Sequence, residues 1–188
     1  MADLLQSFMF VKSTKAPEGL TITQQLRAEH LSFRCMLREM ESSLREQAPD
    51  TPSRVKSALK RLLPLLSAHE QVEEQLLFPA ALEAVSGLRP EIIEMFRAGH
   101  EELNEKLDVL WDALETRMAP VSQFVAVIDF QSHLKDHMEE EEQALFPLIE
   151  KNMPAKLQLT LGENAGRLRG GAARRSKAPK PPSCVETK

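Results

Sequence analysis

The chain has 188 residues, of which 42% are hydrophobic and 28% charged, and its net charge is −4. This length suffices for one domain with a full hydrophobic core, and the composition excludes a disordered chain. The negative charge argues against general affinity for nucleic acid or for an anionic membrane surface. Tyrosine is absent and glycine is scarce, while Leu, Glu, Ala and Met are plentiful, which favours helix over strand.

Residues 1–20 are expected to form a mixed N-terminal arm. Its apolar stretch begins at Leu4, but Asp3 is present and a basic n-region is not, so we expect no secretory signal. We also find no run of about 18 apolar residues that would span a membrane. Cys35 and Cys184 lie in unlike contexts and cannot form a metal cage, which favours a reducing compartment. We therefore expect a cytoplasmic protein with no membrane partner.

Two helices are predicted in the first half of the chain. Thr21 and Gln24 fit a capping box at the start of the first helix, which ends at a proline-rich turn over 48–52. The second helix is expected from about 53 to 85 and should be kinked at Pro64, because proline lacks the backbone N–H. In both segments, apolar residues recur every three or four positions, as in an amphipathic helix.

Two more helices are predicted before the composition changes. The third follows a turn that ends near Pro90, and the fourth begins near Val121. Four long helices with short connections over 21–152 indicate an all-α, up-down-up-down four-helix bundle. Residues 161–188 are rich in glycine, proline, arginine and lysine, and we expect them to form a disordered basic tail. This tail has no aromatic residue for stacking on nucleic acid bases.

One sequence motif, H-x-x-x-E-E-Q-x-L-F-P, occurs twice, at 69–79 and at 137–147. A lone histidine precedes each copy, His30 before the first and His100 before the second, and these two are also about 70 residues apart. The chain is therefore predicted to contain an internal duplication of helix pairs.

The repeated residues have the spacing of metal ligands. Residues four apart on a helix share one face, so a histidine and the glutamate four residues later can reach one site. Four histidines on four apolar helix faces would be costly to bury without partners, and a shared metal removes that cost. The predicted ligands are His30, His69, Glu73, His100, His137 and Glu141.

Three further residues are considered as ligands. His133 lies one turn before His137 and is a possible additional ligand. Glu74 and Glu142 turn about 100° away from the predicted carboxylate ligands and are the alternative pair. If the predicted register is right, replacing these two glutamates should have little effect.

Imidazole and carboxylate donors together favour iron, with manganese or zinc as weaker choices. One metal would need fewer ligands than are present, whereas two metals would each receive two nitrogens and two oxygens. The zinc-protease pattern His-Glu-x-x-His does not occur, nor does the Glu-x-x-His pattern of ferritin-like di-iron proteins. Without tyrosine, a tyrosyl-radical enzyme is excluded as well.

The doubled pattern of His followed by His-x-x-x-Glu-Glu-x-x-Leu-Phe-Pro resembles the hemerythrin-like HHE cation-binding domain, over about residues 21–152. The resemblance implies a four-helix bundle that holds two non-haem iron ions with a bridging oxo or hydroxo group. In the implied arrangement, His30 and His69 bind one iron, His100 and His137 bind the other, and Glu73 and Glu141 bridge the two. Oxygen-carrying members have a histidine where this chain has Phe96, and His133 is extra.

We expect a protein that binds or senses a small diatomic ligand, O₂ or NO, and less a dedicated enzyme. Its catalytic residues, if any, are not predicted, no nucleic acid is expected as a partner, and the sequence does not identify a protein partner. Two alternatives share the same ligands: a di-iron enzyme of peroxide or NO detoxification, and an iron-handling or iron-sensing module.

Overall fold

The computed structural model describes residues 19–46, 48, 50–116 and 118–175, and every regular element in these ranges is a helix. The long helices are α2 (Ile22–Glu46), α3 (Thr51–Val72), α5 (Pro90–Glu115), α6 (Pro120–Glu140) and α8 (Ala155–Arg175). Wide turns and short helices extend two of them: η2 (Glu73–Leu77) and α4 (Phe78–Ala84) follow α3, while η3 (Glu141–Leu145) and α7 (Phe146–Asn152) follow α6. The all-α prediction is confirmed.

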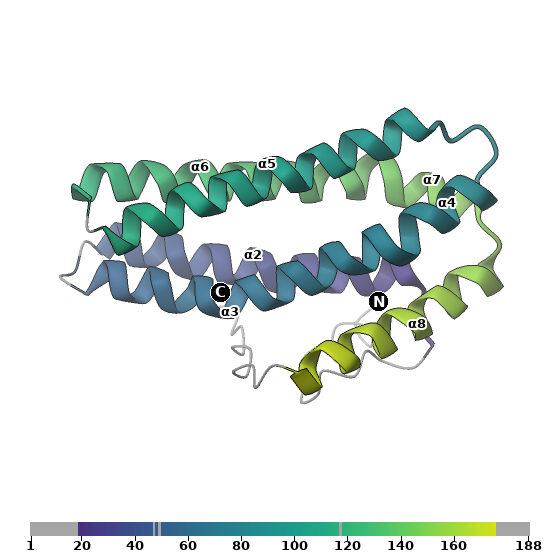
Figure 1. Cartoon of the computed structure of the whole chain (residues 1–188), viewed down its shortest axis with the longest axis horizontal. Helices are drawn as coiled ribbons and strands as arrows, with labels where there is room; N and C mark the ends of the chain where they lie inside the picture. Colours follow the sequence, from purple (N-terminus) through teal and green to yellow (C-terminus); the bar gives the residue numbers. More distant parts are fainter. Residues whose placement is uncertain (1–18, 47, 49, 117, 176–188) are drawn as a thin grey trace, which may run out of the picture.

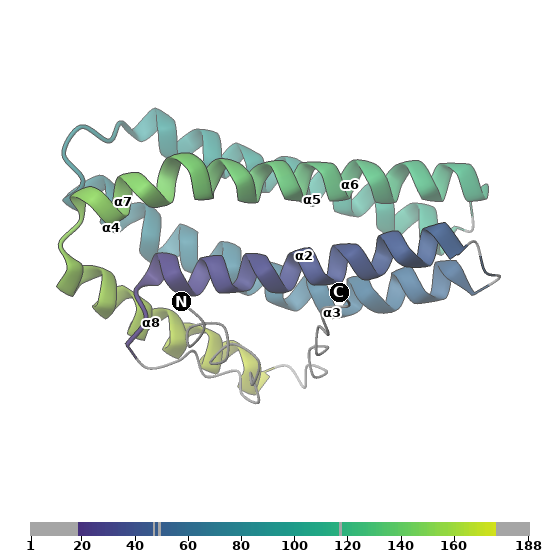
Figure 2. The ribbon, with the colours of Figure 1, turned by 180° about the vertical axis from the view of Figure 1, so that it is seen from behind.

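The helices pack as two pairs. α2 lies along α3, and α5 lies along α6, and the two pairs face each other in both views of the molecule (Figures 1 and 2). α8 lies against α2, α3 and η2, on the side away from the α5–α6 pair. Within the described ranges, no helix combines the length and the apolar character needed to cross a membrane.

Local sequence sets the helix boundaries. The N–H of Thr21 donates to Oε1 of Gln24 at 3.0 Å, and the N–H of Gln24 donates to Oγ1 of Thr21 at 3.4 Å, so the predicted capping box is present. Pro90 and Pro120 begin α5 and α6, where their missing N–H costs no helical hydrogen bond. Pro64 lies inside α3, which continues through it as a helix.

Two apolar clusters fill the space between the helix pairs. One, towards the α2–α3 and α5–α6 turns, contains Phe33, Leu66 and Phe130. The other, towards α4 and α7, contains Phe78 and Phe146. Along each helix pair, the repeated His and Glu positions lie between these two clusters, so polar side chains are enclosed by apolar packing on both sides.

The C-terminal segment differs from the prediction. The expected disordered tail over 161–188 is wrong as far as residue 175, because α8 is a helix and its Leu161 and Ala165 are 7% and 0% exposed. These residues are four apart and add one apolar stripe to the cluster around α4 and α7. The prediction of disorder was based on the glycine- and arginine-rich composition of this segment, and it overlooked the apolar stripe. The rest of the expected tail, 176–188, and most of the predicted N-terminal arm, 1–18, lie outside the described residues.

Candidate metal centre

Six buried side chains from four helices meet between the apolar clusters. They are His30 from α2, His69 from α3, Glu73 from η2, His100 from α5, His137 from α6 and Glu141 from η3. None of these residues is more than 7% exposed. They form two groups in which the ligand atoms lie within 4.8 Å of one another. One group consists of Glu73, His100, His137 and Glu141, and the other of His30, His69 and Glu141. The structure therefore brings together the six residues that the repeat singles out.

The histidines form two pairs. The ring centroids of His30 and His69 are 4.8 Å apart, and their Nε2 atoms are separated by 3.1 Å. The ring centroids of His100 and His137 are also 4.8 Å apart. The first pair thus joins α2 to α3, and the second joins α5 to α6.

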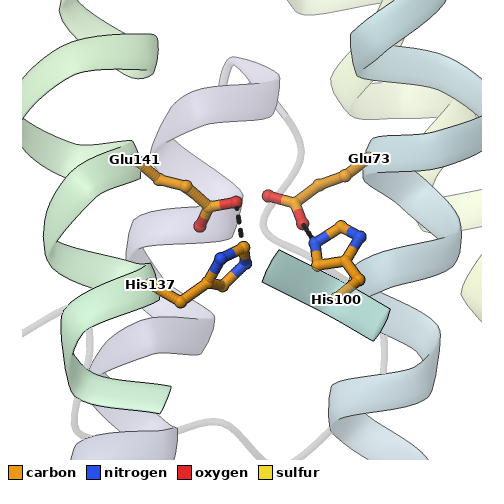
Figure 3. Close-up of side chains that lie close together, drawn as sticks. All are labelled: Glu73, His100, His137 and Glu141. Atoms are coloured by element: carbon orange, nitrogen blue, oxygen red, sulfur yellow. Dashed lines mark ion pairs between the residues drawn. The ribbon is translucent and has the colours of Figure 1, made fainter. Parts of the chain in front are cut away.

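Each central carboxylate reaches both histidine pairs. The two oxygens of Glu141 lie 3.2 Å from Nε2 of His30 and 3.2 Å from Nε2 of His137. Those of Glu73 lie 3.4 Å from Nε2 of His69 and 3.2 Å from Nε2 of His100. Figure 3 shows the two carboxylates facing each other across the centre, with His100 and His137 directed towards them. Each carboxylate thus has one oxygen beside each histidine pair.

Several polar atoms in this centre are buried without a hydrogen-bond partner among the described residues. They are both carboxylate oxygens of Glu73 and of Glu141, and Nε2 of His100 and of His137. An unsatisfied buried polar atom costs roughly 1–3 kcal/mol, so an empty centre of this kind is unfavourable. Cations bound among these groups would give the unpartnered atoms the contacts that they lack.

The two central carboxyl groups differ in their affinity for a proton. Burial raises the pKa of Glu73 well above its usual range, and repulsion from the Glu141 carboxylate adds to this. Burial also acts to raise the pKa of Glu141, but the neighbouring imidazoles of His137 and His30 outweigh it and hold this pKa well below its usual range. The two pKa values are therefore shifted in opposite directions, although both carboxyl groups are fully buried.

A wide helical turn follows the last histidine of each repeat. The N–H of Phe78 bonds to the carbonyl of Glu73, five residues earlier, and Phe146 repeats this bond to Glu141. The next residue, Pro79, has no N–H and its ring would clash with the carbonyl four residues before it, which a wider turn relieves. A regular helical period did not predict these turns, although the repeated Phe-Pro dipeptide was a signal for them.

The outward-facing nitrogen of three histidines lies beside a glutamate that was not predicted to bind there. Nδ1 of His30 lies 2.7 Å from Oε1 of Glu142, and Nδ1 of His69 lies 2.9 Å from Oε2 of Glu29. Nδ1 of His100 lies 3.0 Å from Oε1 of Glu74. Because a carboxylate only accepts, each Nδ1 carries the hydrogen, and each Nε2 presents its lone pair to the centre.

Glu74 and Glu142 therefore face the outer edge of the histidine rings instead of the centre. An arginine fixes each of them, since Nε of Arg97 is 2.8 Å from Glu74 and Nη1 of Arg34 is 2.8 Å from Glu142. The expectation that their replacement has little effect is no longer supported by their contacts. The second glutamate of the repeated Glu-Glu pair was the sequence signal for this role.

The phenylalanines of the repeat cover the histidines. The ring of Phe78 stacks on His100 at a centroid distance of 5.9 Å, and that of Phe146 stacks on His30 at 5.6 Å. Both phenylalanines are fully buried. They close the end of the centre that faces α4 and α7.

The duplication is broken at one position. Glu29 precedes His30 and binds His69, but the equivalent residue before His100 is Gly99. A Cβ at Gly99 would lie 2.9 Å from Nδ1 of His137, so no larger residue fits there without displacing that ring. In the described part of the chain, no carboxylate hydrogen-bonds Nδ1 of His137, so this histidine lacks the carboxylate contact that the other three have.

A surface pocket adjoins the α5 side of the centre. Its volume is about 460 Å³, and its lining includes Glu70, Glu74, His100 and Asn104. Burial raises the pKa of Glu70 to about 7, against the opposing effect of His137. Since His100 is one of its lining residues, this pocket lies beside one histidine of the centre.

The remaining predicted residue, His133, lies elsewhere. Its Nε2 is 3.0 Å from Oε1 of Glu102, and its Nδ1 is 2.8 Å from the carbonyl oxygen of Asp129. The side chain is 32% exposed and belongs to neither group of converging ligand atoms. The suggested additional ligand is therefore not brought to the centre.

Fold and site together define an all-helical protein whose buried His and Glu groups suggest that it binds metal. The family model described as the hemerythrin HHE cation binding domain matches residues 21–149, and the chain belongs to this family. No curated protein and no solved structure matches the chain.

Proposed function

We propose that this protein holds two iron ions at the buried centre and binds or senses O₂ or NO there. The ligands in this proposal are His30, His69, Glu73, His100, His137 and Glu141. The scaffold is an up-down-up-down four-helix bundle with an internal duplication of helix pairs. The observation that carries the proposal is the convergence of four imidazoles on two carboxylates whose buried oxygens lack hydrogen-bond partners.

The donor atoms fit such a cofactor. Nitrogen and oxygen ligands held about 2.1 Å from one metal, at bond angles near 90°, lie about 3 Å apart. The spacings between histidine nitrogens and carboxylate oxygens here are 3.2–3.4 Å. Mixed imidazole and carboxylate donors suit iron, and each half of the centre offers two of each.

The chain's own residues would set the conditions at this cofactor. Glu29, Glu74 and Glu142 keep the hydrogen on the outer nitrogen of three histidines. Phe78 and Phe146, stacked on His100 and His30, would exclude water from one end, and the pocket that His100 lines would let a small molecule approach from the side. Reduced iron, when bound, would supply electrons to O₂ or NO.

A second candidate function is an enzyme that reduces peroxide or NO. Glu70 lines the pocket beside His100, and a carboxyl group at that place favours reactions that consume protons. An iron-handling or iron-sensing role uses the same ligands and requires no reaction with the diatomic molecule.

Metal analysis and optical spectroscopy test the proposal. The purified protein from iron-replete medium is expected to hold about two irons per chain, and the double variant His69→Ala/His137→Ala to hold fewer than one. His133→Ala is the matched control and should retain both metals, because its ring lies outside the centre. One zinc and no iron in the wild-type protein would overturn the proposal.

The spectrum of the reduced protein after exposure to O₂ then separates the functions. A stable new absorption band supports ligand binding, and rapid return to the oxidised spectrum supports the enzyme. No change on exposure, with iron retained, would leave only the iron-handling role.

A further inference from the structure

Arg169, on α8, forms the outermost link of a chain of contacts that leads to the centre. Its Nε lies 2.8 Å from Oε1 of Glu29, and its Nη2 donates to Oε2 of the same carboxylate at 3.0 Å. Its Nη1 donates to Oε1 of Gln25 at 2.9 Å. The side chain of Arg169 is only 12% exposed, so these contacts are largely shielded from water. A guanidinium held against both oxygens of a carboxylate fixes its orientation as well as its charge.

The fixed carboxylate in turn holds a histidine of the centre. Oε2 of Glu29, which receives the bond from Arg169, is also 2.9 Å from Nδ1 of His69. His69 turns its other nitrogen, Nε2, towards Nε2 of His30 and Oε1 of Glu73. The path from α8 to the centre therefore contains one glutamate and one histidine.

The same type of path occurs twice more, but with a different origin. Arg34 holds Glu142 beside His30, and the residues of this path come from α2 and η3. Arg97 holds Glu74 beside His100, from α5 and η2. These two arginines belong to the region that the family model matches, residues 21–149, whereas Arg169 lies beyond it. One of three equivalent supports is thus supplied by a helix outside the domain.

The packing of α8 brings Arg169 into range. A Cβ at Gly162 would lie 2.4 Å from the carbonyl oxygen of Leu20, so the glycine permits an approach that no other residue allows. Leu161 and Ala165 are buried beside it. The helix is consequently anchored within two turns of Arg169, and a shift of α8 would be transmitted to Glu29.

We propose that Arg169 is a positioning residue for the metal centre, through which docking of α8 controls how firmly His69 holds its metal. The inference rests on the proposed metal-binding function. Without the guanidinium, the Glu29 carboxylate is free to rotate towards solvent, and the hydrogen on Nδ1 of His69 loses a fixed acceptor. The ring then exchanges between tautomers and orientations, so that Nε2 directs its lone pair at the metal for less of the time.

The test compares Arg169→Ala and Arg169→Lys with Arg167→Ala, an exposed arginine on the same helix. Metal affinity is measured by competition with a chelator, using Fe²⁺ under anaerobic conditions. Loss of a group that fixes a metal-binding histidine lowers affinity by roughly 10–100-fold, and Arg169 acts one residue further out. We expect a loss of about 3–10-fold for Arg169→Ala, a smaller loss for Arg169→Lys, and none for Arg167→Ala.

A double-mutant cycle shows whether the effect passes through Glu29. Glu29→Ala alone should weaken metal binding by about tenfold, and adding Arg169→Ala to it should cause little further loss. Additive losses would overturn the proposed path.

Imidazole ¹⁵N NMR of the metal-free protein supplies a readout that needs no metal. Nδ1–H of His69 should be a single protected signal in the wild type and should broaden or exchange in Arg169→Ala, while the signals of His100 stay unchanged. Unchanged His69 signals together with unchanged affinity would refute the role of Arg169. If the wild-type protein binds no metal, the proposed function fails, but the NMR comparison still decides whether Arg169 positions His69.

Discussion

Replacement of Glu142 tests whether the carboxylates behind the histidines support the centre. Glu142→Ala removes the acceptor that lies 2.7 Å from Nδ1 of His30 and leaves Arg34 without its partner at 2.8 Å. Such outer carboxylates typically contribute 10–100-fold to metal affinity. The side chain of Glu142 is 23% exposed, so water can replace part of its bond. We therefore expect the lower end of that range, about tenfold or about 1.4 kcal/mol.

The assay is a chelator competition with Fe²⁺ on the folded variants. Glu139→Ala is the matched control, since it removes the same charge from the same repeat and disturbs only an exposed bond from Gln143. Glu142→Gln keeps an acceptor for His30 and should lie between the wild type and Glu142→Ala. Equal affinities for Glu142→Ala and Glu139→Ala would refute the reasoning that Glu142 fixes the His30 ring.

Two further predictions concern stability. Burial raises the pKa of Glu70 from 4.5 to about 7, so the native metal-free protein binds an extra proton between these values and loses stability as pH rises through them. At pH 8, Glu70→Gln should therefore be more stable than the wild type by up to about 3 kcal/mol and melt at a higher temperature, whereas at pH 4.5 the two proteins should melt at about the same temperature. Equal melting temperatures of variant and wild type at both pH values would contradict this prediction. In α8, Gly162→Ala should destabilise by roughly 1–3 kcal/mol in denaturant titrations, because its Cβ meets the carbonyl oxygen of Leu20 at 2.4 Å. Gly166→Ala, with nothing within 4 Å, should instead stabilise by roughly 0.5–1 kcal/mol, and a gain for both variants would show that α8 does not pack as described.

The local part of this protein follows from its sequence. Residues four apart on a helix share a face in any fold, so the spacing of the repeated His-x-x-x-Glu is enough to place His69 with Glu73 and His137 with Glu141. The capping box at Thr21 depends on neighbours three residues apart and was likewise predictable. The duplication then indicated that the two halves carry equivalent chemistry.

Tertiary structure alone decided what surrounds those donors. A helical period specifies which face of a helix is apolar, but not which side chain of another helix will meet its polar edge. The contact between Glu29 and His69 joins residues 40 apart in the chain, and that between Arg169 and Glu29 joins residues 140 apart. No local pattern distinguishes Glu29 from the other glutamates of the helices, or Arg169 from the other arginines of a basic segment. Their roles arise because α8 packs against α2, which depends on the fit of Gly162 and on apolar burial that only the folded chain provides.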